Sequence, residues 1–456
     1  MLKWSKGVKT MVNAREISLK ILLEFEKEEA YSNILLNSKL KNIDVSDADK
    51  ALITKLVYGV ITYKKTLDYI ISNLSKIKLK KISESILNIL RLGLYQIYYL
   101  DKVPNSAACN EAVKLAKKYG HQSSANFVNA ILRNASRKKK EEFFENIENI
   151  NDKLALYYSY PNWIIDLYIK QYGVDRTINI LKENEKVLTD CIRVNTLKIT
   201  KEELLNKLNL EGYSIREGRV DDILYTEELK KLLSSEYFKN GLFTVQDEAP
   251  SLVAHIANPK PGEKILDICA APGGKTTHLA QLSDDRADIT AFEIHEHRCK
   301  LIEDLCRRLD INSVNVEQKD ATIFEEKYVE KFDKIVADVP CSGLGVIRKK
   351  PDIKWNTKEE DINNLIKIQL EILNNAGKYL KNNGILVYST CTNNQEENEQ
   401  IVDKFLTENK NFEIAEINNI PEEFVEYVTN KGMLTLSPDI NNCDGFFICK
   451  LTKTNN

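Results

Sequence analysis

The fold of the carboxyl-terminal half is decided by the stretch Leu266-Asp267-Ile268-Cys269-Ala270-Ala271-Pro272-Gly273-Gly274-Lys275-Thr276-Thr277. A strand-like run, Lys264–Cys269, leads into two glycines, and a helical run, Lys275–Leu282, follows them. A strand, a glycine-rich turn and a helix form a cradle for a cofactor, because glycines allow close backbone approach and a helix amino terminus favours negative groups. The turn has neither the dinucleotide-binding G-x-G-x-x-G pattern nor the glycine spacing of a Walker phosphate loop. It indicates a nucleotide-like cofactor held in another way.

From Pro261 onward, strand-like and helix-like runs alternate, which predicts a doubly wound, Rossmann-like α/β domain. The expected strands are Lys264–Cys269, Ile289–Ile294, Val314–Lys319, Lys334–Asp338, Ile385–Ser389, Phe412–Ile417 and Phe446–Leu451. The expected helices are Lys275–Leu282, His295–Leu309, Glu359–Leu380 and Glu396–Leu406.

Three carboxylates end successive strands of this predicted sheet. Glu293 lies 20 residues after Gly273, at a position suited to hydrogen bonds from ribose hydroxyls, and Asp320 and Asp338 end the next two strands. A crevice rimmed by acids is a poor host for a pyrophosphate. It suits a cationic cofactor such as S-adenosylmethionine, whose sulfonium and amino group are positive.

Two cysteines lie just after strand-like runs, in Asp338-Val339-Pro340-Cys341 and Ser389-Thr390-Cys391. An open α/β sheet places its chemistry at the carboxyl ends of its strands. A thiolate is both a good nucleophile and a good leaving group, so this pattern indicates group transfer through a covalent cysteine adduct. The alternative is that both are buried structural thiols, the commoner fate of cytosolic cysteine.

A metal site is a second alternative, because His295, His297, Cys299 and Cys306 fall on one predicted helix. Only His295 and Cys299 share a face at the i, i+4 spacing. The sequence therefore predicts no metal site.

Charge is distributed unevenly along the 456 residues. Residues 1–150 hold 26 Lys/Arg and 16 Asp/Glu, a net charge of +10, whereas the remainder holds 39 and 51, a net of −12. A basic amino-terminal third is consistent with a nucleic-acid partner, although a solvated basic surface is the alternative. Nine cysteines without regular spacing, together with the lack of a secretory signal or a long apolar stretch, predict a cytoplasmic protein that is not membrane-bound.

Three parts are expected along the chain: helical residues 1–145, an α+β connector over 146–260 and the Rossmann-like domain over 261–456. In the first part, Ser85–Leu100 is apolar over most of its circumference, as in the central helix of a bundle.

The chain resembles the NOL1/NOP2/Sun family of RNA cytosine-5 methyltransferases. The motifs that carry the resemblance are Asp267–Lys275, Asp338–Gly343 and Ser389–Thr392. The segment Gly345–Trp355 and the entry Thr244–Glu248 are similar to the bacterial branch that acts on small-subunit ribosomal RNA, and Phe127–Asn134 resembles a NusB-type helical domain. The resemblance spans nearly the whole chain. Val339 stands where the family usually has alanine.

The resemblance implies a role for each matched residue. A class I S-adenosylmethionine-dependent methyltransferase domain would hold its cofactor through Cys269, Ala270, Ala271, Pro272, Gly273, Gly274, Lys275, Glu293, Asp320 and Asp338. Cys391 matches the nucleophile, Cys341 the product-releasing cysteine and Asp338 the acid that faces the target cytosine. Apart from the resemblance, Arg348, Lys349, Lys350 and Lys354, with Trp355, form a basic and aromatic stretch of the kind that binds phosphate and stacks a base, and the alternative is a surface loop with a packed tryptophan.

The expected activity is methylation of cytosine C5 in 16S ribosomal RNA through a cysteine–C6 adduct, with small-subunit ribosomal RNA as the partner. The same chemistry on transfer RNA is one alternative. An RNA-binding or antitermination module with an inactive methyltransferase domain is another. The oligomeric state and the modified nucleotide are not readable from the sequence.

Overall fold

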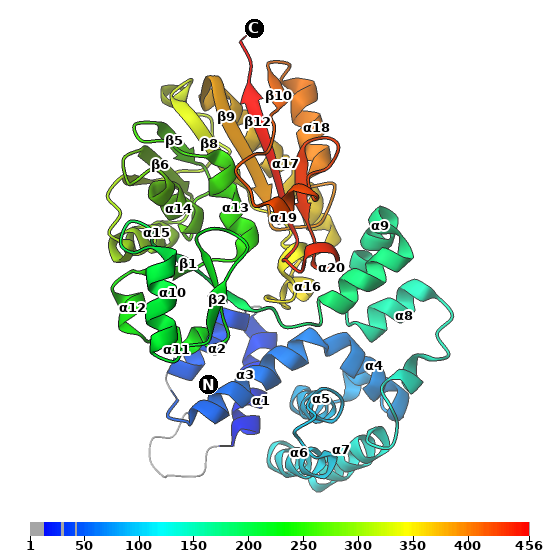
Figure 1. The fold of residues 1–456 in the computed structure, drawn as a ribbon. Helices are drawn as coiled ribbons and strands as arrows, with labels where there is room; N and C mark the ends of the chain where they lie inside the picture. The colour runs from blue at the N-terminus through cyan, green and yellow to red at the C-terminus, as the bar shows by residue number, and fades with distance from the viewer. Residues whose placement is uncertain (1–12, 29–31, 42, 456) are drawn as a thin grey trace. The chain divides into compact units, whose positions relative to one another are not determined.

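The computed structural model describes residues 13–28, 32–41 and 43–455, whose helices and strands are drawn in Figure 1. The chain forms two compact units. Unit 1 takes in residues 1–178 and 349–357, and unit 2 takes in residues 179–348 and 358–456. The domain boundaries expected near residues 145 and 260 stay predictions.

Unit 1 is helical, as predicted. Its helices in the amino-terminal part are α1 (Ala14–Glu28), α2 (Ser32–Lys41), α3 (Asp47–Thr62), α4 (Lys64–Leu74), α5 (Glu84–Tyr99), α6 (Asn105–Tyr119), α7 (Gln122–Ala135) and α8 (Ile150–Tyr157), with 3-10 turns η1 (Leu79–Lys81) and η2 (Glu141–Phe144). Helix α5 packs against α1, α3, α4, α6 and α7, which confirms the predicted central helix. Its buried Arg91 donates hydrogen bonds to both carboxylate oxygens of Asp68, at 2.7 and 2.8 Å, and to Glu26 at 2.6 Å. A long helical stretch, α9 (Asn162–Glu183), is interrupted at Gly173, which has a φ of 76°.

A short segment from the second half of the sequence, residues 349–357 with α16 (Ile353–Asn356), also belongs to unit 1. The Trp355 ring packs against the core of the helical unit, and its indole N–H donates to the Ile61 carbonyl at 2.7 Å. The Lys354 ammonium is buried and donates to the Thr62 carbonyl at 2.8 Å. The phosphate-binding and base-stacking roles predicted for Lys354 and Trp355 are therefore wrong, because both side chains are occupied inside unit 1.

The first part of unit 2 is the expected α+β connector. Its antiparallel sheet has the order β2-β3-β1-β4, with strands β1 (Asp190–Val194), β2 (Ile215–Glu217), β3 (Ile223–Thr226) and β4 (Phe243–Val245). Helices α10 (Lys201–Leu210), α11 (Leu229–Leu232) and α12 (Glu236–Lys239) accompany it. Helix α10 begins with a capping box in which Thr200 and Glu203 satisfy each other's backbone N–H groups.

The second part of unit 2 is the predicted α/β domain, built on a sheet of order β10-β12-β9-β8-β5-β6-β7, with β11 paired to β12. Its strands are β5 (Lys264–Asp267), β6 (Asp288–Glu293), β7 (Val314–Gln318), β8 (Phe332–Asp338), β9 (Leu380–Thr390), β10 (Phe412–Ile414), β11 (Met433–Leu436) and β12 (Phe446–Lys453). Its helices are α13 (Glu248–Ala257), α14 (Gly274–Leu282), α15 (Glu296–Leu309), α17 (Glu359–Tyr379), α18 (Glu399–Glu408), α19 (Glu422–Val425) and α20 (Pro438–Asn441), with 3-10 turns η3 (Glu326–Tyr328) and η4 (Leu344–Val346). Strands β5 to β9 pair in parallel, whereas β12 runs antiparallel to β9.

Alternate residues of each central strand face two different cores, because side chains alternate across a strand. Val336 and Val387 belong to the core that contains residues of α13, α14 and α15. Their neighbours Ile335 and Leu386 belong to the core that contains residues of α17 and α18. Helices therefore cover both faces of the sheet, which confirms the predicted architecture.

Some predicted elements differ in detail. Strand β11, which pairs with β12, was not predicted, because four residues are too short to show a pattern. Helix α18 begins at Glu399 rather than at Glu396, because residues 392–398 form a hydrogen-bonded turn. Among the described residues, no helix combines the length and apolarity needed to cross a membrane.

The position of Trp355 makes its replacement a test of stability rather than of RNA binding. We expect Trp355→Ala to lower the free energy of unfolding of the full-length protein by about 3 kcal/mol, the lower end of the range for truncating a core tryptophan, because the Trp355 side chain is only partly buried. Urea denaturation followed by circular dichroism measures this. The exposed Lys350, replaced by alanine, is the matched control and should change stability by less than about 0.5 kcal/mol. A Trp355→Ala protein that keeps its stability but loses RNA affinity would restore the base-stacking role.

Candidate active site

The candidate active site lies along the carboxyl edge of β5, β6, β7, β8 and β9. In this sheet β5 pairs with β6 on one side and with β8 on the other. The chain passes outward from β5 through β6 and β7 and then returns to β8 on the other side of β5, so this is the switch point at which open α/β sheets form their ligand crevice. All the strand-end residues predicted from the sequence emerge at this edge.

The glycine-rich turn enters helix α14 through a left-handed residue. Gly273 has a φ of 99°, and a Cβ atom there would lie 3.3 Å from the Ile302 backbone. Glycine is required by both features. Arg193, in the connector, holds the turn in place. Its guanidinium donates to the Gly274 carbonyl at 2.6 Å and to the Thr277 hydroxyl at 2.9 Å. The sequence analysis missed Arg193, because 80 residues separate it from the turn.

Asp267, at the end of β5, is fully buried beneath the turn. One carboxylate oxygen accepts a hydrogen bond from Thr276 at 2.7 Å, while the other, Oδ1, is buried with no hydrogen-bond partner. Burial raises the pKa of Asp267 to about 6, and nearby Asp338 adds to the effect. Burial also raises the pKa of the Cys269 thiol, with Asp267, Asp338 and Glu293 acting in the same direction. The crevice floor is thus short of positive charge.

Glu293 and Asp320 end the neighbouring strands β6 and β7. The buried Glu293 accepts a hydrogen bond from the His295 backbone N–H at 2.9 Å and lies 3.3 Å from the Arg298 guanidinium. Asp320 is half-buried and accepts from the Thr322 N–H at 2.9 Å and the Thr322 hydroxyl at 2.7 Å. Arg298 also donates to the Ala271 carbonyl at 3.2 Å, so it links Glu293 to the glycine-rich turn.

Lys275 joins the turn to the end of β8. Its ammonium lies 2.6 Å from Asp338 Oδ2, and the Ser389 hydroxyl donates to Asp338 Oδ1 at 2.8 Å. Burial alone would lower the pKa of Lys275, but Asp338, Asp267 and Cys391 outweigh it and raise that pKa. Lys275 is therefore a fixed positive charge inside an acidic site.

The two strand-end cysteines come together. The sulfurs of Cys341 and Cys391 are 3.2 Å apart, although 50 residues separate them in the sequence. Both side chains are half-buried, and all nine cysteines of the chain are free thiols. The contact with Cys391, burial and the charge of Glu397 raise the pKa of Cys341 well above its usual range. The protonated form of Cys341 is accordingly favoured over its thiolate.

Arg348, seven residues after Cys341, was predicted to bind phosphate. Its side chain is 2% exposed and its guanidinium donates to Asp444 at 2.6 Å. That prediction is wrong, because the charge of Arg348 is already paired inside unit 2.

Potential metal ligands converge at one place in the described residues, and it is not the helix considered from the sequence. His295 and His297 stack on each other as exposed rings, and Cys299 is directed to the Glu293 carbonyl. The converging group is Asp222, His255 and His278.

The spacing in this converging group is that of hydrogen bonds. The carboxylate of Asp222 lies 2.5 Å from His278 Nε2 and 3.1 Å from His255 Nε2. Two ligands of a tetrahedral zinc ion, each about 2.0–2.1 Å from the metal, would be about 3.3 Å apart. Burial lowers the pKa of His278 to about 4, so a neutral imidazole faces the carboxylate. The group resembles a proton-sharing network.

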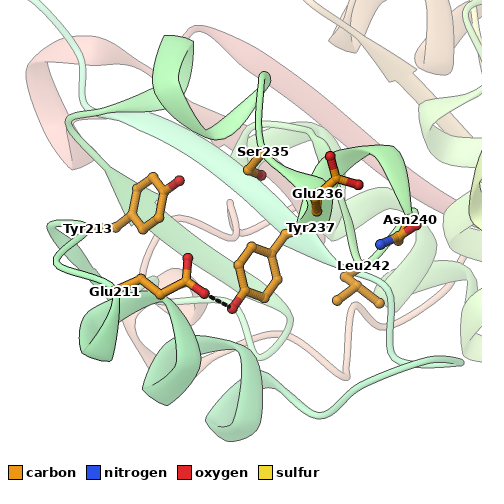
Figure 2. Close-up of a pocket in the computed structure, with 7 residues that line it drawn as sticks. All are labelled: Glu211, Tyr213, Ser235, Glu236, Tyr237, Asn240 and Leu242. Carbon is orange, nitrogen blue, oxygen red and sulfur yellow. Dashed lines mark hydrogen bonds between the residues drawn. The ribbon is translucent and has the colours of Figure 1, made fainter.

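A surface pocket of about 340 Å³ lies in the connector (Figure 2). Its lining consists of Glu211, Tyr213, Ser235, Glu236, Tyr237, Asn240 and Leu242, and the Tyr237 hydroxyl donates to Glu211 at 2.6 Å. None of these residues belongs to the strand-end site. The pocket therefore adds nothing to the chemistry assembled there.

Family models match three successive regions of the chain. Residues 12–137 match the NusB family, residues 160–227 match a ferredoxin-like domain of RsmF/B-like methyltransferases, and residues 254–452 match the model described as 16S rRNA methyltransferase RsmB/F. The three matches follow the helical part, the connector and the α/β domain in order.

Similar proteins are matched over nearly their whole length. A probable ribosomal RNA small subunit methyltransferase B from Bacillus subtilis is 37% identical over 97% of this chain and 99% of its own. Ribosomal RNA small subunit methyltransferase B from Klebsiella pneumoniae is 32% identical over 98% and 100%. A solved structure of a methyltransferase homologue from Pyrococcus horikoshii is 31% identical over 67% of this chain and 98% of its own, with a TM-score of 0.58. The crystal structure of PH0851 superposes over 98% of this chain and 100% of its own, with a TM-score of 0.80 and 27% identity. Full-length likeness at this identity, on an α/β domain with its strand-end residues in place, shows that the chain belongs to the 16S rRNA methyltransferase RsmB/F family.

Proposed function

We propose that this protein transfers a methyl group from S-adenosylmethionine to C5 of a cytosine in small-subunit ribosomal RNA, through a transient bond between Cys391 and C6 of the base. The observation that carries the proposal is the pair of sulfurs, 3.2 Å apart, at the carboxyl ends of adjacent parallel strands. The names of the relatives, which describe small-subunit ribosomal RNA methyltransferases, support the substrate class.

The charges and hydrogen-bonding groups of the crevice fit the proposed cofactor. Asp267 Oδ1 is buried without a hydrogen-bond partner, and the carboxylates of Asp267, Glu293 and Asp338 outnumber their two cationic neighbours, the Lys275 ammonium beside Asp338 and the Arg298 guanidinium 3.3 Å from Glu293. A ligand that carries positive charge and hydrogen-bond donors would satisfy such a site. Residues Cys269–Lys275, Glu293, Asp320 and Asp338 would hold the cofactor, with Glu293 at its ribose. When bound there, S-adenosylmethionine supplies an electrophilic methyl group on a sulfonium.

Cytosine C5 is too weak a nucleophile to accept a methyl group directly. The thiolate of Cys391 adds to C6, forming a carbon–sulfur bond and making C5 electron-rich. After C5 has gained its methyl group, a base removes the C5 proton and the carbon–sulfur bond breaks, which restores the ring and the thiolate. This is nucleophilic catalysis, which divides one difficult step into easier ones.

The charges around the two sulfurs support the assignment of Cys391 as the nucleophile. The Lys275 ammonium interacts favourably with the Cys391 thiolate, whereas the Glu397 carboxylate favours the neutral thiol of Cys341. Opposite neighbours thus direct the negative charge to Cys391 and the proton to Cys341. Asp338, fixed by Lys275 and Ser389, is the group placed to hydrogen-bond the cytosine edge.

The target base would have to leave its stack, because C5 and C6 of a paired base are shielded above and below the ring. Unit 1, whose family match is to NusB, is the proposed source of further RNA contacts.

The substrate is tested with labelled S-adenosylmethionine and two RNAs, unmodified small-subunit ribosomal RNA and unmodified transfer RNA. We expect 5-methylcytidine at one position of the ribosomal RNA, mapped after nuclease digestion. Label in transfer RNA alone would keep the chemistry and change the substrate. Cofactor binding without label in either RNA would favour an RNA-binding module with an inactive domain.

The nucleophile is tested by replacing each cysteine in turn. Cys391→Ala should lower kcat by more than about 10³-fold and yield no covalent RNA complex on denaturing gels, because no thiolate remains to add to C6. Cys341→Ala should retain adduct formation and accumulate the covalent complex, because release is slowed. An active Cys391→Ala protein would refute the assignment.

Glu293 is tested by isothermal titration of S-adenosylmethionine. Glu293→Ala should weaken binding by about 1.5–3 kcal/mol, the value of hydrogen bonds to a charged group, while leaving kcat at saturating cofactor within a small factor. The control is Glu296→Ala, an exposed acid three residues on that pairs with Lys300. Equal affinity in the two variants would remove Glu293 from the cofactor site.

A further inference from the structure

A buried carboxylate whose hydrogen bonds the proposed chemistry has not yet explained lies beside the two cysteine-bearing turns. Glu397 has no solvent exposure, and it follows Cys391 by six residues in the turn that precedes α18. The sequence analysis had assigned this residue to the first turn of a helix, where a glutamate would face solvent. Its actual position inside the protein needs a physical reason, because a buried charge is costly unless it is fully paired.

Four donors surround the carboxylate. Oε1 accepts from the Ser342 backbone N–H at 2.8 Å and from Gln369 Nε2 at 3.0 Å. Oε2 accepts from the Ser342 hydroxyl at 2.5 Å and from Asn394 Nδ2 at 3.1 Å. An ionised carboxylate accepts about four hydrogen bonds, so Glu397 is saturated without a cation beside it.

These donors come from both turns. Ser342 directly follows Cys341, and its hydroxyl also lies 2.8 Å from the hydroxyl of Thr392, the residue after Cys391. Gln369, on α17, donates in addition to the carbonyl of Pro340, the residue before Cys341, at 3.0 Å. The carboxylate therefore fixes the backbone on both sides of Cys341, and it ties that segment to the turn after Cys391 through Asn394 and through the Ser342–Thr392 hydroxyl pair.

Two further contacts tie the same turns together. The Gly345 N–H donates to the Cys391 carbonyl at 3.1 Å, and the Gly445 N–H donates to the Gly345 carbonyl at 2.8 Å. A Cβ atom at Gly345 would collide with the Gly445 carbonyl, so these turns have little room to shift. Glu397 is the one charged group in this set of contacts, and its charge also bears on Cys341.

We propose that Glu397 is a positioning residue for methyl transfer: its carboxylate holds the Cys341 and Cys391 turns in register and keeps the two sulfurs within reach of the same base. The proposal rests on the proposed function, because the separation of the sulfurs matters only if both act on the cytosine. It adds to that function a residue whose side chain hydrogen-bonds to neither sulfur. Its hydrogen bonds hold the two turns, and the turns determine where the sulfurs lie.

The test compares Glu397→Ala and Glu397→Gln with Glu399→Gln. Glu399 is the matched control, because it is a partly buried acid two residues along the chain whose carboxylate Oε2 has no hydrogen-bond partner. Three quantities are measured on the full-length protein: kcat with ribosomal RNA, the Kd of S-adenosylmethionine, and the pH midpoint of Cys341 alkylation by iodoacetamide, resolved by peptide mass spectrometry.

We expect Glu397→Ala to lower kcat by about 10²-fold, as a misplacement of about 1 Å does, while the cofactor Kd stays within about twofold. Glu397→Gln, which keeps the shape, should lose less activity. In Glu397→Gln the alkylation midpoint of Cys341 should fall by about 1 pH unit, because a neighbouring negative charge is gone. Glu399→Gln should leave all three quantities unchanged.

Two outcomes would overturn the proposal. One is a kcat within twofold of the unsubstituted protein in both Glu397 variants. The other is a parallel loss of kcat, cofactor affinity and thermal stability with an unmoved alkylation midpoint in Glu397→Gln, which describes a merely structural residue. If the Glu397→Ala protein does not fold, the Glu397→Gln protein still decides between these outcomes. A failure of the proposed function is recognised separately, because an active Cys391→Ala protein refutes the nucleophile while the alkylation result for Cys341 stands.

Discussion

The parallel pairing of β8 with β9 is the constraint on which the candidate site depends. Asp338 pairs in register with Ser389, so both strands end at the same edge and at the same height. Each cysteine follows within three residues, and the two turns then have to converge. Because side chains alternate across a strand, a slip of one residue would turn Asp338 or Ser389 to the other face of the sheet and break their hydrogen bond. The antiparallel strand β12 covers the outer edge of β9 and protects this register.

The charges of the site add to the effect of this geometry. The site contains several carboxylates, and that of Asp267 is fully buried. The Lys275 ammonium pairs directly with another of them, that of Asp338. The raised pKa of Asp267 means that its ionisation opposes folding: the carboxyl favours the folded state fully below about pH 3.8, and that contribution is lost as pH rises towards 6. A positively charged ligand would relieve this cost. Lys275 also interacts electrostatically with Cys391, so its positive charge bears on both the carboxylates and one of the two sulfurs.

The sequence was sufficient for the elements with strong local signals. The turn at Gly273 and Gly274, the strand-end acids and the central helix α5 are visible because each depends on neighbours a few residues away. It was insufficient where a side chain contacts residues that are far away in the sequence. Arg193 donates a hydrogen bond to the glycine-rich turn, 81 residues further along the chain. Trp355 packs in the helical unit and donates to a carbonyl there. Glu397 was placed in a helix because its neighbours have helical character, whereas tertiary hydrogen bonds hold it in a turn.

The connector has a larger part in the site than its position in the sequence indicates. Arg193 is completely buried, and burial lowers its pKa to about 9, with Asp222 opposing the shift. Asp222 in turn faces His278 on α14, so one carboxylate of the connector compensates the arginine and contacts the helix that follows the glycine-rich turn. Removing either charge would leave the other buried without compensation, which is costlier than replacing both. The connector and the glycine-rich turn therefore stabilise each other, and a ligand that binds the turn stabilises the connector strand that holds it. This coupling explains why both parts belong to one compact unit.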